Sequence, residues 1–534
     1  MFDILIQNAL IYDGSGEVAY MADVAVEDGK IALIAKKGTE NGNLLENADA
    51  EKIVNANGLS LSPGFIDSHS HSDLAILEDP HRLHVLRMGV TTEIAGQCGY
   101  SRSPDDGVMS DAVRLTVSNH MGRSFKNMRE LISALDTAEL GTNQLYFTGH
   151  ALLRGRALGT EARAANDSEI KQMQDMLASE MAMGSAGVST GLSYVPGIYS
   201  DTRELTELGK CAGECGGLYV THSRSESMEL FDSVNECIDI ARYGNVSVNI
   251  SHFKCVGKVF WDRCERALSM IDKAIDEGLD ITIDAYPYIA ASTTTLSAIP
   301  SRFLEDGIEE FVRRLDDPNV VEDIRREIFE INDPSWDNSI YYVGLENFLI
   351  VRAENTPWAV GKTYAQIGEM LNISPFDAVI YMLKNNNGSV YECRFSMCEE
   401  NVETILKHPT CTVGSDGLYQ PGDLSAHPRA FGTFPRYLGH YIRERGILSR
   451  EEGIRRITSM PAERYGLVGK GRIAVGYDAD LVLFDYDTIS DGGDFMDPFK
   501  PNVGISAVYM NGELVLADNE PTGVYNGRYL RRQK

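Results

Sequence analysis

Residues 64–73 read GFIDSHSHSD, a short apolar run that leads into two histidines one residue apart. In an extended strand alternate side chains lie on the same face, so His69 and His71 would point the same way from the end of a strand. Two imidazoles held in this way can bind a metal ion, although a His-x-His pair also occurs on polar surfaces or packed in a core. The spacing alone leaves these interpretations evenly balanced.

The same pattern, a short apolar run that ends in polar residues, recurs along the middle of the chain. The eight runs are GFIDSHSH, TTEIAGQCG, LYFTGH, AGVSTGLSY, LYVTHSR, VNISHFK, ITIDAYPY and CTVGSDG. Helical patterns such as EIKQMQDMLASEMAM separate most of them. Eight strands that alternate with helices predict an α/β fold, a TIM-like (β/α)8 barrel, whose active site lies at the carboxyl ends of the strands.

The two ends of the chain have a different texture from the middle. Residues 1–61 and 466–534 read as short strands joined by turns. Two β-rich ends around an α/β middle predict one small β-sandwich domain assembled from both termini, with the barrel at 62–465.

One connection within the predicted barrel is too long for a loop. It runs from Tyr288 to Cys411 and contains strongly charged helical sequence. We therefore predict an inserted lid subdomain over the mouth of the barrel, at about 293–350.

The composition excludes several classes of partner. The chain of 534 residues carries 49 lysines and arginines against 78 aspartates and glutamates, a net charge of −29 at pH 7. Such an acidic chain is poorly suited to the phosphate backbone of nucleic acids and to anionic membrane surfaces. The N-terminus lacks a basic segment followed by an apolar one, and nowhere do about 18 apolar residues run together, so we expect a cytoplasmic protein. We expect a small-molecule substrate, and the sequence leaves the oligomeric state open.

The nine cysteines are scattered without a disulfide-like framework, which suits a reducing compartment. Cys211 and Cys215 have helical spacing and could bind a metal ion. Two packed thiols are the better interpretation, because no second Cys or His pair lies nearby.

Six candidate metal ligands follow predicted strands, all at the same end of the predicted barrel. They are His69, His71, Cys98, His222, His252 and Asp416. Imidazole, thiolate and carboxylate are the ligands that Zn²⁺ prefers. Each residue could singly be an ordinary core histidine, inert thiol or turn residue, but six coincident placements are harder to explain in that way. The sequence therefore predicts a site for one or two zinc ions.

Taken together, these motifs resemble the N-acyl-D-amino-acid deacylase (D-aminoacylase) branch of the amidohydrolase superfamily. The resemblance covers nearly the full length, in the family's order, through PGFIDSHSHSD, GVTTEIAGQCGYS, GSAGVSTGLSYVPG, THSRSE, ISHFKCVGK, DAYPYIAAST, VGSDG, HPRAFGTFPR and GRIAVGYDADLVLFD. It implies that Cys98, His222 and His252 hold one tightly bound zinc ion. It also implies that His69, His71 and Asp416 line a second position that is weakly occupied. AGVSTGLSY lacks the lysine with which many superfamily relatives bridge two metals.

The chemistry of zinc then suggests roles for the polar residues. Bound Zn²⁺ lowers the pKa of water towards about 7 and so creates a nucleophile for an amide carbonyl. Asp416 is the expected general base and acid, although an aspartate before Gly417 could instead only form a turn. Tyr194 or His150 could help the metal to stabilise the oxyanion, or either could simply pack in the barrel.

A free α-carboxylate on the substrate requires local positive charge in this acidic chain. Lys254 shares the face of His252 if the strand continues, and Arg429 lies in HPRAFGTFPR. By resemblance Lys254, Tyr286, Ser292 and Arg429 grip the carboxylate; a surface cation or a core aromatic is the alternative for each. The stretch from Asp416 to Arg429 is longer than the family pattern and the lid diverges, which bears on side-chain specificity and not on the metal chemistry.

We therefore expect zinc-dependent hydrolysis of the amide bond of N-acyl-D-amino acids to a carboxylate and a free D-amino acid. The D preference follows only from the resemblance. The alternatives are a dipeptidase or cyclic-amide hydrolase on the same barrel, or a relative that keeps the barrel as a non-catalytic scaffold.

Overall fold

A (β/α)8 barrel forms the middle of the computed structural model, which describes residues 1–107, 123–331, 333 and 336–533. One arc of parallel strands consists of β6 (Phe65–Asp67), β7 (Val90–Ala95) and β8 (Asn143–Tyr146). The other consists of β9 (Thr148–Gly149), β10 (Gly187–Gly191), β11 (Leu218–His222), β12 (Ser247–Ile250), β13 (Ile281–Ala285) and β17 (Cys411–Val413).

The two arcs join into a ring. The Ser68 amide donates to the Val413 carbonyl at 3.3 Å, and the Ala186 amide donates to the Tyr146 carbonyl at 2.8 Å. All residues of β7, β10 and β11 are buried. Strands covered on both faces lack the polar alternation of half-exposed strands, and β-branched residues recur in VTTEIA, GVSTG and LYVTH, which explains why these strands could be recognised in the sequence.

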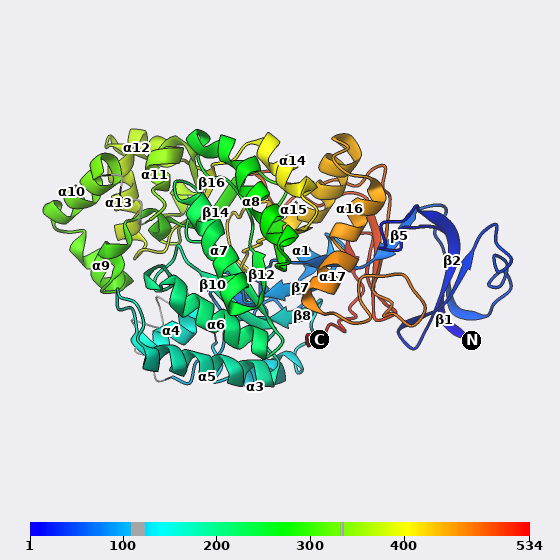
Figure 1. The fold of residues 1–534 in the computed structure, drawn as a ribbon. Coiled ribbons are helices and arrows are strands. Elements are labelled where there is room, and N and C mark those ends of the chain that lie inside the picture. The colour runs from blue at the N-terminus through cyan, green and yellow to red at the C-terminus, as the bar shows by residue number, and fades with distance from the viewer. Residues whose placement is uncertain (108–122, 332, 334–335, 534) are drawn as a thin grey trace.

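Helices surround the ring (Figure 1). They are α1 (Leu83–Leu86), α3 (Met128–Leu135), α4 (His150–Leu158), α5 (Asp167–Met183), α6 (Thr202–Glu214), α7 (Leu230–Gly244), α8 (Cys264–Asp276), α14 (Glu399–Lys407), α15 (Arg429–Arg436), α16 (Arg450–Arg456) and α17 (Ser459–Tyr465). Local sequence sets their starts: Asn166 and Glu169 form a capping box at α5, and the Asp201 side chain accepts from the Glu204 amide at α6. The apolar side of α6, with Leu205 and Leu208, is buried against the barrel.

Both ends of the chain build a second domain. Its nine-stranded sheet contains β1 (Phe2–Ile11), β2 (Tyr20–Glu27), β3 (Lys30–Lys36), β4 (Ala50–Asn55), β5 (Ser60–Pro63), β18 (Leu481–Phe484), β19 (Ile505–Met510), β20 (Glu513–Ala517) and β21 (Glu520–Pro521). β18 pairs with β5, so the N-terminal and C-terminal strands form one sheet around a shared core that includes Ile6, Val24 and Leu483. The predicted fold, a barrel with a β domain made by both termini, is confirmed.

The long connection after β13 is a subdomain with its own core. It contains β14 (Ala290–Thr294), α9 (Ile308–Arg314), α10 (Pro318–Arg326), α11 (Ser339–Val343), β15 (Phe348–Arg352), α12 (Tyr364–Leu371), α13 (Pro375–Asn385) and β16 (Tyr391–Phe395). Its apolar core runs from Leu296 to Val390 and so continues beyond the predicted 293–350, because β14 pairs with β16 and the unit closes only there. Residues 332, 334 and 335 of the predicted range lie outside the described residues. Figure 1 shows this subdomain and the β domain at opposite ends of the barrel.

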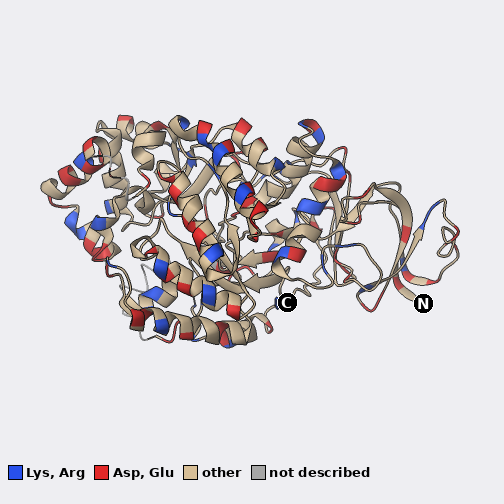
Figure 2. Ribbon diagram, in the orientation of Figure 1, with Lys and Arg blue, Asp and Glu red and all other residues tan. Residues whose placement is uncertain are grey.

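Charge is mixed over the outer surface. Figure 2 shows lysine and arginine interspersed with aspartate and glutamate along the helices of the barrel and the inserted subdomain. Among the described residues, no helix has the length and apolar character needed to cross a membrane.

Candidate metal centre and active site

The six predicted ligands come together at the carboxyl ends of the barrel strands. His69 and His71 follow β6, Cys98 follows β7, His222 ends β11, and His252 and Asp416 follow β12 and β17. Cys98, His252 and Asp416 have backbone φ angles of 54°, 37° and 48°. Such left-handed conformations are uncommon outside glycine and tend to cluster at functional sites, where the surrounding structure holds them.

Three of these residues form one donor group. The candidate ligand atoms of Cys98, His222 and His252 all lie within 4.8 Å of one another, and the Cys98 Sγ is 3.3 Å from the His252 Nε2. Bond lengths of about 2.3 Å to sulfur and 2.0 Å to nitrogen place tetrahedral donors about 3.5 Å apart. The Nε2 of His222 contacts the Ser193 hydroxyl at 2.8 Å, whereas its buried Nδ1 has no partner among the described residues. Nδ1 is therefore the nitrogen of His222 that is free to bind an ion.

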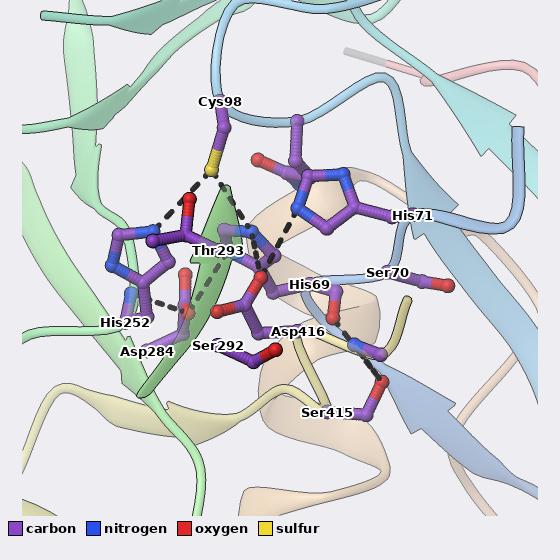
Figure 3. A network of polar contacts seen from close by, with 12 residues as sticks. His69, Ser70, His71, Cys98, His252, Asp284, Ser292, Thr293, Ser415 and Asp416 are labelled. Carbon is purple, nitrogen blue, oxygen red and sulfur yellow. Dashed lines mark hydrogen bonds and ion pairs between the residues drawn. The ribbon is translucent and has the colours of Figure 1, made fainter. Parts of the chain in front are cut away.

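The remaining ligands form a second group around the same thiol. His69, His71, Cys98 and Asp416 also have candidate ligand atoms within 4.8 Å of one another. The Asp416 Oδ1 lies 3.1 Å from the His71 Nε2 and 3.5 Å from the His69 Nε2. In Figure 3 these side chains point toward one another beneath Cys98. The donor chemistry fits a soft or borderline cation such as Zn²⁺.

The acidic candidate ligands are held in the ionised form that binds metal ions. Burial alone would raise the pKa of the Cys98 thiol, but the neighbouring His252 and His69 hold that pKa well below its ordinary value. Burial would also raise the pKa of Asp416, but Arg429 and the histidines hold it well below its ordinary value. Thiolate and carboxylate are the forms in which these side chains bind metal ions.

Two acidic residues that the sequence analysis did not single out orient the histidines. The Asp284 Oδ1 accepts from the His252 backbone amide at 2.7 Å and lies 3.2 Å from the His69 Nδ1. The Glu226 Oε1 lies 3.2 Å from the His252 Nδ1. A carboxylate is the usual second partner of a metal-binding histidine, because it holds one ring nitrogen and leaves the other free for a metal ion. Asp284 lies inside the apolar strand run ITIDAYPY. An acidic residue within a buried strand is unusual, and this could have marked Asp284 as a functional residue in the sequence.

The four residues of the predicted carboxylate grip all line the cavity beside the metal ligands. The Arg429 Nη2 lies 2.9 Å from the Asp416 Oδ2 and donates to the Ser292 carbonyl at 3.1 Å. The Arg429 Nε and Nη1 and the Tyr286 hydroxyl are buried and find no hydrogen-bond partner among the described residues. Buried donors left in this state call for a ligand.

Lys254 has a different environment from the other three. Its Nζ lies 2.5 Å from the Glu226 Oε1 and 2.8 Å from the His252 Nδ1. The lysine shares the face of His252, as the spacing predicted, but Glu226 already balances its charge. Its part in gripping a carboxylate stays a prediction.

Only one of the two candidate oxyanion donors, Tyr194 and His150, lies at the cavity. Tyr194 lines the cavity, and its hydroxyl contacts the Thr293 Oγ1 at 3.0 Å. His150 does not line it: the fully buried ring contacts the Glu204 Oε1 at 2.7 Å, and Arg154 pairs with the other oxygen of Glu204. His150 is therefore held in a buried polar cluster with Glu204 and Arg154 at the start of α4, and Tyr194 is the better candidate.

Known proteins with similar sequences are amidohydrolases. Residues 344–516 match the family model described as "Amidohydrolase family". The chain is 32% identical to a D-aminoacylase of Alcaligenes xylosoxydans xylosoxydans, over 99% of this chain and 98% of that protein. This chain is a member of the N-acyl-D-amino-acid deacylase family of amidohydrolases.

Other members of the deacylase family differ in the amino acid named for them. An N-acyl-D-aspartate deacylase of the same organism is 31% identical over 98% of this chain and 93% of its own length. The crystal structure of N-acyl-D-glutamate deacylase from Bordetella bronchiseptica, complexed with zinc and a phosphonate mimic of the tetrahedral intermediate, superimposes with a TM-score of 0.83 at 30% identity and covers 99% of both chains. Similar identity to relatives with different substrates means that side-chain preference has to be sought in the cavity itself.

Proposed function

We propose that this deacylase-family protein hydrolyses the amide bond of N-acyl-D-amino acids to a carboxylate and a free D-amino acid. The observation that carries the proposal is one cavity that joins the Cys98 donor group to an arginine with free, buried donors. A metal ion suits a carbonyl group, and a guanidinium suits a carboxylate. The D configuration rests on the names of the relatives.

We propose that Cys98, His222 and His252 hold one zinc ion, and that His69, His71 and Asp416 line a weaker second position. When bound, zinc would polarise the amide carbonyl and make water acidic enough to supply hydroxide at neutral pH. Asp284 and Glu226 would keep His69 and His252 in the required orientation.

Asp416 is the proton carrier in this proposal. Its carboxylate is ionised and can accept a proton as water adds to the carbonyl carbon. The carbon–nitrogen bond then breaks while the same proton passes from Asp416 to the nitrogen, because an amine anion is too poor a leaving group to depart unprotonated. The products are a carboxylic acid and a neutral amine, and the acid releases its proton to solvent at neutral pH to give the carboxylate.

Arg429 links substrate binding to the basicity of Asp416. One of its nitrogens contacts Asp416 while two others are free. A substrate carboxylate on the free nitrogens shares the charge of the guanidinium and weakens its hold on Asp416. The pKa of Asp416 then rises toward its ordinary value, which makes it a better base once substrate is bound.

The assay of choice pairs N-acetyl-D-amino acids with their L counterparts and measures free amine released by zinc-loaded protein. We expect turnover of the D series, its loss after a chelator removes the metal, and its return when zinc is added. Turnover of the L series alone would contradict the stereochemical part of the proposal. Turnover of hydantoins or dipeptides alone would favour the cyclic-amide hydrolase or dipeptidase, and a chain that takes up no zinc would favour the scaffold.

Tyr194→Phe and His150→Gln form a matched pair that tests the oxyanion donor. If the Tyr194 hydroxyl meets the developing charge, Tyr194→Phe lowers kcat about 10-fold to 100-fold with little change in melting temperature. His150→Gln disturbs the pair with Glu204 and should lower the free energy of unfolding by about 1–3 kcal/mol while leaving kcat nearly unchanged. A large kcat loss in His150→Gln with an unchanged melting temperature would reverse the assignment.

A further inference from the structure

A second, mainly apolar cavity lies beside the reaction cavity, and we call it the side chamber. Its aliphatic and aromatic walls are Val195, Ile198, Leu296, Ile299, Leu304, Ile308 and Trp336. Most of these residues belong to the apolar core of the inserted subdomain. The side chamber and the reaction cavity share the lining residues Tyr100, Ser193, Tyr194, Ser297 and Asp337, so the two cavities are direct neighbours.

The side chamber opens on the side of the barrel opposite the proton carrier. β8 and β9 are separated by a single residue and together form the third strand of the barrel, so β10 is the fourth strand and β17 the eighth. The wall residues Val195 and Ile198 follow β10, whereas Asp416 and Arg429 follow β17. β14 connects the two sides: Ser292 contacts Arg429, Thr293 contacts the Tyr194 hydroxyl, and Thr294 lines the side chamber.

This arrangement orients the scissile amide. The nitrogen must lie near Asp416, which protonates it, and the carboxylate next to that nitrogen must lie near Arg429. The amide carbon is planar, so its other substituent points away from the nitrogen. That substituent is the hydrocarbon tail of the acyl group, and it is directed from β17 toward β10.

We propose that the side chamber binds the tail of the acyl group, so that acyl groups of about four to six carbons are preferred to acetyl. The inference rests on the proposed deacylase function and deepens it. The side chamber has a volume of about 60 Å³. That is well below the about 150 Å³ of a cavity that takes up benzene, so it suits a short aliphatic tail and not an aromatic one. Arg394 and Ser396 line the reaction cavity and not the side chamber, so in this arrangement they would face the side chain of the amino acid.

The test is an acyl series on one amine. Zinc-loaded protein is given N-acetyl-, N-butanoyl-, N-hexanoyl-, N-decanoyl- and N-benzoyl-D-methionine, and kcat/KM is measured from the free D-methionine released. Each buried methylene is expected to raise kcat/KM about 4-fold, which corresponds to about 0.8 kcal/mol, until the side chamber is full. We expect kcat/KM to increase from acetyl to hexanoyl and to fall for decanoyl and benzoyl.

Two substitutions of a single wall residue sharpen the test. Ile299 is buried, lines the side chamber and is not among the residues that line the reaction cavity. Ile299→Phe fills the space and should abolish the advantage of hexanoyl over acetyl while leaving acetyl turnover within about 3-fold of the wild type. Ile299→Ala enlarges the space and should move the preferred acyl group to a longer chain. If Ile299→Phe does not fold, Ile308→Phe at the partly exposed edge of the side chamber replaces it.

Val256→Leu is the matched control, because Val256 lines the reaction cavity and not the side chamber. It should keep the wild-type acyl profile while changing the ranking among D-amino acids. A flat acyl profile in an active wild type would overturn the inference and leave the deacylase function intact. A changed amino-acid ranking in the Ile299 variants, with an unchanged acyl profile, would place the amino-acid side chain in the side chamber instead. Absence of turnover for every N-acyl-D-amino acid would overturn the proposed function itself.

Discussion

Asp416→Asn is expected to lower kcat by at least about 100-fold while the protein stays folded and keeps most of its zinc. The amide of asparagine cannot take a proton from water at neutral pH, nor return one to the leaving nitrogen. Loss of general acid–base catalysis accounts for about 10²–10⁴ in rate, and Asp416 is proposed to act in both directions. The measurements are kcat with an N-acetyl-D-amino acid, zinc per chain by elemental analysis and the melting temperature.

The fold should tolerate this substitution for a local reason. Asp416 has a φ of 48°, and asparagine is among the residues that adopt left-handed backbone most readily. The Asp416 backbone amide donates to the His69 carbonyl at 2.7 Å, a bond that does not depend on the side chain. Asparagine can also keep an oxygen toward Arg429, whose contact with Asp416 is 2.9 Å.

Asp67→Asn is the matched control for Asp416→Asn. Asp67 is a buried carboxylate that accepts from the Ser415 backbone amide and hydroxyl, next to Asp416 in the chain, but it does not line the cavity. Burial raises the pKa of Asp67 to about 7, and asparagine keeps an oxygen that can accept from the Ser415 backbone amide. We expect kcat within about 3-fold of the wild type. Loss of zinc from Asp416→Asn in proportion to activity would show that Asp416 acts mainly as a metal ligand.

The barrel and its rim could be predicted from the sequence because their signals are local. All of β7 (VTTEIA) and β11 (LYVTH) is buried, so neither strand shows the polar alternation of a half-exposed strand, and β-branched residues recur in both. The polar residues at the end of each strand mark where it stops. Strand ends of a parallel barrel meet at one rim, so Cys98 and His222 could be placed near each other without any contact information.

Features that depend on distant pairing could not be predicted in the same way. The inserted subdomain closes only when β14 pairs with β16, about a hundred residues later in the chain, and no local pattern marks that end. Lys254 was placed on the correct face by strand periodicity, but its pairing with Glu226 joins two different loops. His150 follows a strand and looks like a site residue, yet the turn of α4 directs it to Glu204.

Cys98→Ser should remove the metal and with it nearly all activity. Cys98 is the residue that the two donor groups share, so its loss weakens both positions. A serine hydroxyl stays protonated at neutral pH and is a poor ligand for zinc, whereas the pKa of the Cys98 thiol is held well below its ordinary value. We expect zinc to fall well below one ion per chain and kcat/KM to fall at least about 1,000-fold, because metal activation supplies several kcal/mol of transition-state stabilisation.

The change at Cys98 is separable from a general effect on folding. Cysteine and serine are similar in shape, so the backbone strain at a φ of 54° is the same before and after the substitution. Cys237→Ser is the control, because that thiol is equally buried within α7 but belongs to neither donor group. It should lower the melting temperature without changing zinc content.

His71→Asn, which changes only the second donor group, should retain one zinc ion and measurable turnover. Full zinc content and activity in Cys98→Ser would contradict the proposed site, because they would show that the ion does not depend on the Cys98 sulfur.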